Sequence, residues 1–269
     1  MERIAEGREA EIYAWQPGTV LKLYRDAADA QRAAWEHAAT AAVASAGGPA
    51  PRPIGLLTVR GRPGLVLERV DGPDLVTAMA RRPWTVLTAG AAMGRAHASI
   101  HAITAPASLP ATRAQLERAI RRAEAPSSWR DAALRTLERL PDGERLSHND
   151  LHAQNVLLAA TGPVVIDWPG ATRGDAAADV ARSLVLFAVG APLPSAPRRV
   201  RLFARPATGI VRWRYLVAYR AVGALDEVAV HSWLLPQAVA RLAEFIPGER
   251  ERVERLVRRL LSSDTRSAR

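Results

Sequence analysis

The sequence contains no cysteine among its 269 residues. This absence excludes disulfide bonds, zinc ribbons, cysteine-ligated iron–sulfur clusters and a thiol nucleophile. The chain also has no uninterrupted apolar run of the roughly 18 residues that a membrane span requires. Its first residues, MERIAEGREAEIY, do not show the charged and then apolar pattern of a signal peptide. We therefore expect a cytoplasmic protein with no membrane partner.

Lysine and asparagine are almost absent. Lys22 is the only lysine beside 36 arginines, and Asn149 and Asn155 are the only asparagines. A chain that uses arginine nearly everywhere retains lysine where a compact ammonium is needed, because the guanidinium group is larger, planar and forked. The scarcity directs attention to Lys22 and to the segment that holds both asparagines.

The remaining composition is that of an ordinary folded protein. Apolar residues make up 48% and charged residues 24% of the chain, which argues against extensive disorder. The net charge is +10, and +9 of it lies after Arg69. Such an excess could attract nucleic acid, anionic lipid or a phosphorylated substrate. Because no basic run exceeds two residues, we interpret it as arginine on solvated helices and expect no nucleic-acid partner.

The first seventy residues have strand-like segments around one helix. The segments 4–15, 19–25 and 64–70 have strand-like content and are punctuated by Gly-Pro and Pro-Gly pairs. The Ala-rich segment 26–47 predicts a helix that ends at a Gly-Gly-Pro sequence. Asp-Gly-Pro at 71–73 then predicts a boundary between two lobes.

Helical patterns dominate after Pro83, except in one place. Two short apolar runs, 155–160 and 163–168, flank a Thr-Gly-Pro turn and predict a β-hairpin. Helices resume near Ala176. The chain thus reads as α+β, with a small β-rich lobe over 1–70, a hinge at about 67–73 and a large, mostly helical lobe over 74–269.

The hairpin lies within the segment that carries chemistry. His148-x-Asp150-x4-Asn155 precedes it, and Asp167 follows its second strand. Asn155 and Asp167 stand at the two open ends of the hairpin and can face one site. Mg²⁺ prefers such hard oxygen ligands. Asp150 can approach an acceptor hydroxyl from the other side and take up its proton, which is the arrangement that phosphoryl transfer requires.

This segment resembles the catalytic loop of the protein-kinase-like fold, in its aminoglycoside phosphotransferase and choline kinase branch. The downstream Gly174-Asp175-x3-Asp179 matches the same branch. The resemblance implies a bilobal fold and transfer of the γ-phosphoryl group of ATP, or GTP, to a hydroxyl. It assigns Asp150 as the catalytic base, and Asn155 and Asp167 as Mg²⁺ ligands.

The resemblance also implies roles for residues around this loop and in the first lobe. Lys22 would hold the nucleotide phosphates and Glu36, on the following helix, would orient it. The loop that covers the phosphates has only Gly7 where protein kinases have several glycines. In the hinge, the backbone of Glu68 through Val70 would read the adenine edge. Outside the nucleotide site, His148 and Asp179 would brace the catalytic loop, and Leu67 would line the base pocket.

The short spacing after Asp167 argues for a small acceptor. Only seven residues separate Asp167 from Asp175 and no Ala-Pro-Glu follows, whereas a protein kinase needs a longer segment to seat a peptide. Candidate acceptors are an antibiotic, a sugar, a nucleoside or an amino alcohol. The positive second lobe disfavours a polycationic aminoglycoside. The alternatives are an atypical protein kinase, a nucleotidyl transferase, or a nucleotide-binding pseudokinase or scaffold; the last is disfavoured because Lys22, Asp150, Asn155 and Asp167 are all present.

Several other residues are open to two interpretations. His152 could contact phosphate or pack. His97, His101 and His231 lack metal-ligand company in the sequence, so we interpret them as ordinary surface or core histidines. The region around the acceptor offers a set of aromatic and acidic side chains, of which the aromatic ones are more often core than pocket: Trp129, Trp213, Tyr215, Tyr219, Asp226, Glu227, Trp233 and Glu244. The sequence does not specify an oligomeric state.

Overall fold

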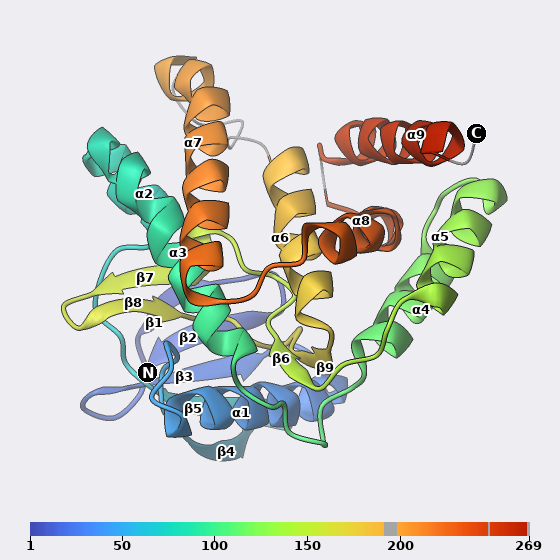
Figure 1. Cartoon of the computed structure of the whole chain (residues 1–269). Coiled ribbons are helices and arrows are strands. Elements are labelled where there is room, and N and C mark those ends of the chain that lie inside the picture. Colours follow the sequence, from blue (N-terminus) through green and yellow to red (C-terminus); the bar gives the residue numbers. More distant parts are fainter. Residues whose placement is uncertain (191–197, 247, 268–269) are drawn as a thin grey trace.

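A five-stranded antiparallel sheet forms the first part of the computed structural model, with strand order β1-β2-β3-β5-β4 (Figure 1). The structure describes residues 1–190, 198–246 and 248–267, except for the side chains of 198–205 and 264–267. The strands and the helix α1 that packs on the sheet have these bounds: β1 Arg3–Glu6, β2 Ala10–Ala14, β3 Thr19–Tyr24, β4 Pro53–Val59, β5 Arg62–Glu68 and α1 Ala30–Ser45.

The alternation of side chains along β3 decides which residues face α1. Leu21 and Leu23 pack with Val66 on one face of the sheet. Lys22 and Tyr24 point to the opposite face, because successive side chains of a strand alternate. Burial leaves Lys22 only 6% exposed. A charged group at such depth requires a partner, and α1 supplies it.

The sequence prediction differs from the structure at three places in the sheet and its helix α1. The segment 4–15 forms two strands joined by a turn, because the Gly7 N–H donates to the Ala10 carbonyl. The helix predicted over 26–47 is shorter, since a 3₁₀ turn capped by Asp26 precedes α1. The strand β4 was not predicted. Its Pro53 and Gly55 resemble loop residues, and they are tolerated because β4 lies at the sheet edge.

The second part is mostly helical and contains two small antiparallel pairs of strands. α3 and α7 lie side by side, and α4 and α5 pack against α8 (Figure 1). The helix bounds are α2 Leu75–Arg81, α3 Val86–His101, α4 Thr112–Arg122, α5 Ser127–Arg139, α6 Ala176–Val189, α7 Arg198–Val222, α8 Glu227–Arg241 and α9 Arg250–Ser267. The strand pairs are β6 Arg145–Ser147 with β9 Thr172–Gly174, and β7 Val156–Ala159 with β8 Gly162–Val165.

The predicted α+β class and the predicted hairpin are therefore confirmed. One core joins the helices to the hairpin and includes Met93, Leu151, Val165, Trp168 and Tyr215. None of the described helices combines the length and the apolar character needed to cross a membrane.

Two glycines allow α3 to approach α7 closely. A Cβ atom at Gly90 would lie 2.1 Å from the Val211 carbonyl oxygen, and one at Gly94 would lie 2.2 Å from that of Tyr215. Neither oxygen can move without displacing the α7 backbone. The sequence therefore sets the distance between these helices through the absence of two side chains.

Replacing Gly94 by Ala should destabilise the fold by about 1–3 kcal/mol, the usual range for overpacking a core. Gly209 on α7 is the matched control, because a Cβ atom there would meet nothing within 4 Å. Gly209→Ala should stabilise by up to about 1 kcal/mol, since alanine is the better helix former. Denaturant unfolding measures both changes. If both substitutions changed the free energy of unfolding in the same direction, the close approach of α3 to α7 would be contradicted.

Candidate functional site

The segment predicted to be the catalytic loop starts where β6 ends and carries a strained backbone. Asn149 has a φ of 62°, in the left-handed region that few side chains adopt. Its side-chain amide compensates by donating to the Gly170 carbonyl at 2.9 Å and to the Thr172 hydroxyl at 2.7 Å. His148 is buried, and its Nε2 lies 3.1 Å from the Ile166 carbonyl oxygen. These contacts tie the loop to the strand that ends at Asp167.

The open ends of the β7–β8 hairpin bring Asn155 and Asp167 together. The Ile166 N–H donates to the Asn155 carbonyl at 2.9 Å. The Asn155 Nδ2 donates to the Asp150 carbonyl at 2.9 Å and lies 3.3 Å from Asp150 Oδ2. No protein group in the described part of the chain donates to its side-chain oxygen. That oxygen and the Asp167 carboxylate are thus a donor set that fits Mg²⁺.

Lys22 links the sheet to this hairpin. Its Nζ lies 2.8 Å from Glu36 and 2.5 Å from Asp167 Oδ1, a residue 145 positions away. The ammonium holds the pKa of Asp167 below its ordinary value, although burial acts in the opposite direction. Burial alone would lower the pKa of Lys22, but the two carboxylates outweigh it and raise the pKa. Lys22 and Asp167 are therefore both ionised at neutral pH.

Glu36 is the centre of a second set of contacts. It is fully buried on α1 and accepts hydrogen bonds from Lys22, from the Tyr24 hydroxyl and, at 3.0 Å, from the Trp168 N–H. The last of these bonds fixes the backbone next to Asp167, whose φ of 69° is also in the left-handed region. Such strain persists where surrounding contacts hold it, and it gathers at functional sites.

Asp150 is half-buried between the side chains of His152 and Arg182. His152 Nε2 lies 3.4 Å from its Oδ2, and Arg182 Nη2 lies 3.9 Å from its Oδ1. Burial would raise the pKa of Asp150, but the hydrogen bond and charge of His152, with Arg182, lower it to about 2. Asp150 is thus an ionised but weak base, suited to orienting a hydroxyl and to accepting its proton late in the reaction.

Arg182 was not identified by sequence reasoning. It is buried, donates from Nε to the Asn149 carbonyl at 3.0 Å and places Nη2 2.6 Å from Glu244 Oε1. The other Glu244 oxygen pairs with Arg241, so both oxygens of this carboxylate have an arginine partner. The sequence signal for Arg182 is its position three residues after Asp179, because this spacing puts both side chains on the same face of α6.

The remaining predicted residues lie at the edges of this region. Gly7 is exposed in the β1–β2 turn, and the neighbouring Arg8 donates to the Glu244 carbonyl at 3.2 Å. Glu68 ends β5, and its N–H donates to the Arg52 carbonyl at 2.8 Å. The Val70 N–H has no hydrogen-bond partner within the described residues. It is therefore free to donate a hydrogen bond to the base of a nucleotide.

The aromatic candidates are divided between core and surface. Tyr215, Tyr219 and Trp233 are buried, Trp129 is partly buried, and Trp213 is 60% exposed. The acidic candidates on α8 have local structural roles. Asp226 caps the helix by accepting from the Val228 and Ala229 N–H groups, and Glu227 pairs with Arg220. The interpretation of the buried aromatic residues as core is confirmed.

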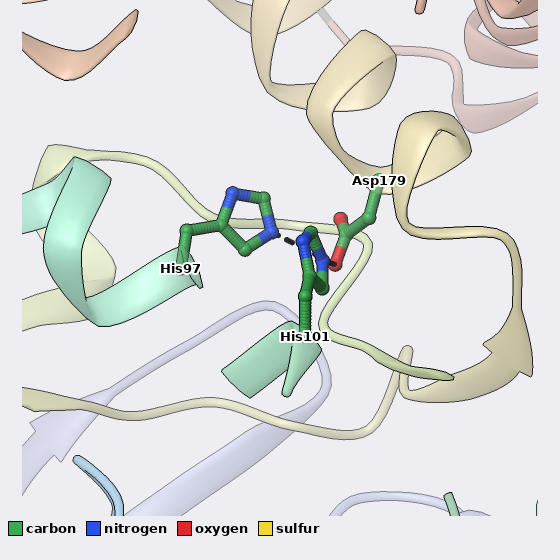
Figure 2. Close-up of side chains that lie close together, drawn as sticks. All are labelled: His97, His101 and Asp179. Carbon is green, nitrogen blue, oxygen red and sulfur yellow. Dashed lines mark hydrogen bonds and ion pairs between the residues drawn. The ribbon is translucent and has the colours of Figure 1, made fainter. Parts of the chain in front are cut away.

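The expectation that the three isolated histidines lack ligand company is wrong for two of them. His97 and His101 lie together on α3 and meet Asp179 from α6 (Figure 2). Their Nε2 atoms are 3.0 and 3.2 Å from Asp179 Oδ2. The sequence separates the histidines from the aspartate by about eighty positions, so only the folded helices bring them together. His231, by contrast, is exposed on α8, as interpreted.

Stability should fall as the pH drops from about 6.5 to about 4. Burial and the neighbouring His101 lower the pKa of His97 to about 4, whereas an unfolded histidine titrates near 6.5. Between these values the unfolded state binds the extra proton, which costs the fold up to about 1.4 kcal/mol per pH unit. Burial lowers the pKa of His148 as well.

Denaturant unfolding at pH 7, 6 and 5 tests this expectation. His97→Gln removes one titrating group, so its stability should change less steeply with pH than that of the wild type. Identical slopes for the two proteins would contradict the assignment of a neutral, buried His97.

Comparisons with known proteins complete the description of the site. A family model described as "Phosphotransferase enzyme family" matches residues 1–216. No curated protein matches the chain.

Solved structures resemble nearly the whole chain. A thermostable mutant of aminoglycoside phosphotransferase APH(4)-Ia, in complex with ADP and hygromycin B, is 19% identical, with a TM-score of 0.64 over 97% of this chain and 91% of that one. A putative fructosamine-3-kinase from Haemophilus somnus 129PT is 14% identical, with a TM-score of 0.64 over 97% and 90%. APH(2")-IIIa with GDP and kanamycin is 16% identical, with a TM-score of 0.59 over 97% and 90%. At these identities the likeness concerns the fold, and it confirms the predicted protein-kinase-like class.

Proposed function

Because the chain belongs to the phosphotransferase enzyme family and is a small-molecule kinase, we propose that it transfers the γ-phosphoryl group of ATP to a hydroxyl of a small, uncharged or weakly charged compound. The observation that carries this proposal is the 2.5 Å contact between Lys22 and Asp167. This contact supports the proposal because Lys22 would bind the phosphates and Asp167 would hold the metal ion, with Asp150 and Asn155 in the adjoining loop.

Each residue of the proposed site has its own role in binding the nucleotide or the acceptor. Asn155 and Asp167 would hold Mg²⁺, which neutralises charge on phosphate oxygens when it is bound. Lys22, oriented by Glu36, binds the phosphates as a point charge. The β1–β2 turn around Gly7 covers them, and Asp150 orients the acceptor hydroxyl.

The nucleotide base would lie against the hinge. The proposed hinge, about 67–73, joins a first lobe over 1–70 to a second lobe over 74–269, and the backbone of Glu68 through Val70 reads the base. The free Val70 N–H supports this placement. GTP is the alternative donor, because two of the similar structures contain GDP.

The charges near Asp150 favour an acceptor without several positive groups. Glu244 shares the partner Arg182 with Asp150, and the two oxygens of Glu244 are bound by Arg182 and Arg241. It therefore has no free oxygen for an acceptor amine. Arg8 adds a further positive charge at the same edge. A sugar, a nucleoside or a neutral antibiotic fits this environment better than an aminoglycoside.

Acceptor-dependent release of ADP from Mg²⁺–ATP tests the proposal. The panel contains neutral sugars, nucleosides, amino alcohols and neutral antibiotics, with hygromycin B and kanamycin as polycationic comparisons. We expect a neutral compound to be phosphorylated faster than either polycation, with no turnover by Asp150→Ala. Turnover only with the aminoglycosides would overturn the acceptor class. Tight Mg²⁺–ATP binding without transfer to any compound would favour the pseudokinase or protein-kinase alternative.

A further inference from the structure

Asp179 holds the start of the catalytic loop by its backbone. The side chain is fully buried. Its Oδ1 accepts from the Asn149 N–H at 2.9 Å, and its Oδ2 accepts from the His148 N–H. These are the two residues directly before Asp150. Any displacement of the Asp179 carboxylate therefore moves the backbone that carries the Asp150 side chain.

Two histidines one helical turn apart on α3 hold the same carboxylate from the other side (Figure 2). The His101 Nε2 makes a hydrogen bond to Asp179 Oδ2 at 3.2 Å. The His97 Nε2 lies closer, at 3.0 Å, but its N–H is not aligned with the oxygen, and it makes no hydrogen bond. His101 is thus the better-aligned donor of the two, and His97 acts through its dipole.

Two tyrosines on α7 hold the outer nitrogen of each ring. The Tyr215 hydroxyl lies 2.7 Å from His97 Nδ1, and the Tyr219 hydroxyl lies 2.7 Å from His101 Nδ1. The spacing of four residues on α7 matches the spacing of four on α3. The close approach of the two helices at Gly90 and Gly94 permits this register.

The directions of these hydrogen bonds follow from the charge of Asp179. Burial would raise its pKa, but the two histidines outweigh this effect and hold the pKa well below its ordinary value, so the group only accepts. In the neutral His97 ring the proton is then on Nε2, and Nδ1 accepts from the Tyr215 hydroxyl. His101 likewise donates from Nε2 to Asp179, and its Nδ1 lies at the Tyr219 hydroxyl. Burial raises the pKa of both tyrosines, which keeps these hydroxyls protonated as donors.

We propose that His97 and His101 are positioning residues for Asp150, which they place by holding Asp179 between the α3–α7 helix pair and the catalytic loop. His101 contributes more than His97 to the position of Asp179, because the His101 N–H is the aligned hydrogen-bond donor. This inference rests on the proposed function in assigning the catalytic role to Asp150. Displacement of a catalytic group by about 1 Å can cost about 10²-fold in rate, so loss of this support should lower kcat without weakening nucleotide binding.

Paired substitutions distinguish the contribution of Nε2 from that of Nδ1 in each histidine ring. A glutamine amide reaches the position of Nε2 and can still donate to Asp179, whereas an asparagine amide reaches only the position of Nδ1. We expect His101→Asn to lower kcat about 10- to 100-fold with the KM for ATP changed less than about twofold, and His101→Gln to recover most of the loss. His97→Asn should have a smaller effect than His101→Asn. His231→Asn, on the exposed face of α8, is the matched control and should behave as the wild type.

Amide hydrogen exchange supplies a readout that needs no acceptor substrate. The His148 and Asn149 N–H groups should lose protection in His101→Asn and retain it in His101→Gln. If these amides lose protection but no acceptor is phosphorylated by the wild type, the positioning network stands and the proposed function fails.

Three results would overturn the positioning role. One is an equal loss of kcat in His101→Asn and His101→Gln that follows their loss of stability, which would indicate a merely structural role. Another is unchanged protection of both amides in His101→Asn. The third comes from metal analysis, because His97, His101 and Asp179 offer three ligand atoms within 4.8 Å of one another. One transition-metal ion per wild-type chain, absent from His101→Asn, would replace the hydrogen-bond network with a metal site.

Discussion

Replacing Asp150 by Asn should lower kcat by about 10³-fold, within the range of about 10² to 10⁴ that a positioned acid or base contributes. Asparagine keeps the shape of the side chain and its place between His152 and Arg182, but it can neither accept the hydroxyl proton nor attract the hydroxyl as a charge does. Because Asp150 lies in the loop rather than beside Lys22, the KM for ATP should change by less than about twofold. Steady-state kinetics with the phosphorylated acceptor measures both constants.

The low pKa of Asp150, about 2, sharpens this expectation. A group that is so weakly basic does not remove the hydroxyl proton before the phosphorus–oxygen bond begins to form. The rate loss in Asp150→Asn should therefore be the same at pH 6 and at pH 8. Asp131→Asn on the exposed face of α5 is the matched control. An Asp150→Asn protein that keeps full kcat, or that loses ATP binding instead, would refute the role of this residue.

The parts of the site that the sequence predicts are those that local chemistry determines. The hairpin follows from two apolar runs around a Gly-Pro turn, and its open ends must bring Asn155 and Asp167 together whatever the rest of the chain does. Lys22 and Glu36 are only fourteen positions apart, on a strand and the next helix. Short spacing is enough to predict that the Lys22 and Glu36 side chains meet and that the backbones at the hairpin ends lie together, although the roles of these residues stay predictions.

The parts that the sequence does not predict depend on packing between distant elements. Arg182 reaches Glu244 only because η4, Leu242–Glu244, lies beside α6. His97 and His101 meet Asp179 across about eighty residues, and nothing in the periodicity of α3 distinguishes them from other buried side chains. The edge strand β4 was missed for a different reason, since its proline and glycine are tolerated only at an edge. Tertiary contact decides each of these positions.

Replacing Lys22 by Arg should lower kcat/KM for ATP by about 10²- to 10³-fold, the loss that follows removal of one preorganised electrostatic group. The charge is kept, so the effect arises from size and shape. Lys22 is only 6% exposed, and its one small ammonium contacts both Glu36 and Asp167. A planar guanidinium cannot replace it without separating these carboxylates. Asp167 would then lose its present contact with residue 22.

The reverse exchange on the same strand region is the matched control. Arg25 directly follows β3, and its side chain is 40% exposed. Arg25→Lys should therefore leave kcat/KM within about twofold of the wild type and change stability by less than about 0.5 kcal/mol. Kinetics with ATP and denaturant unfolding of both variants make the comparison. If Lys22→Arg turned over ATP as well as the wild type, the retention of one lysine among 36 arginines would have no catalytic cause. The phosphate-binding role would then pass to another cation. Arg8, which already reaches across to Glu244, would then be the next residue to replace.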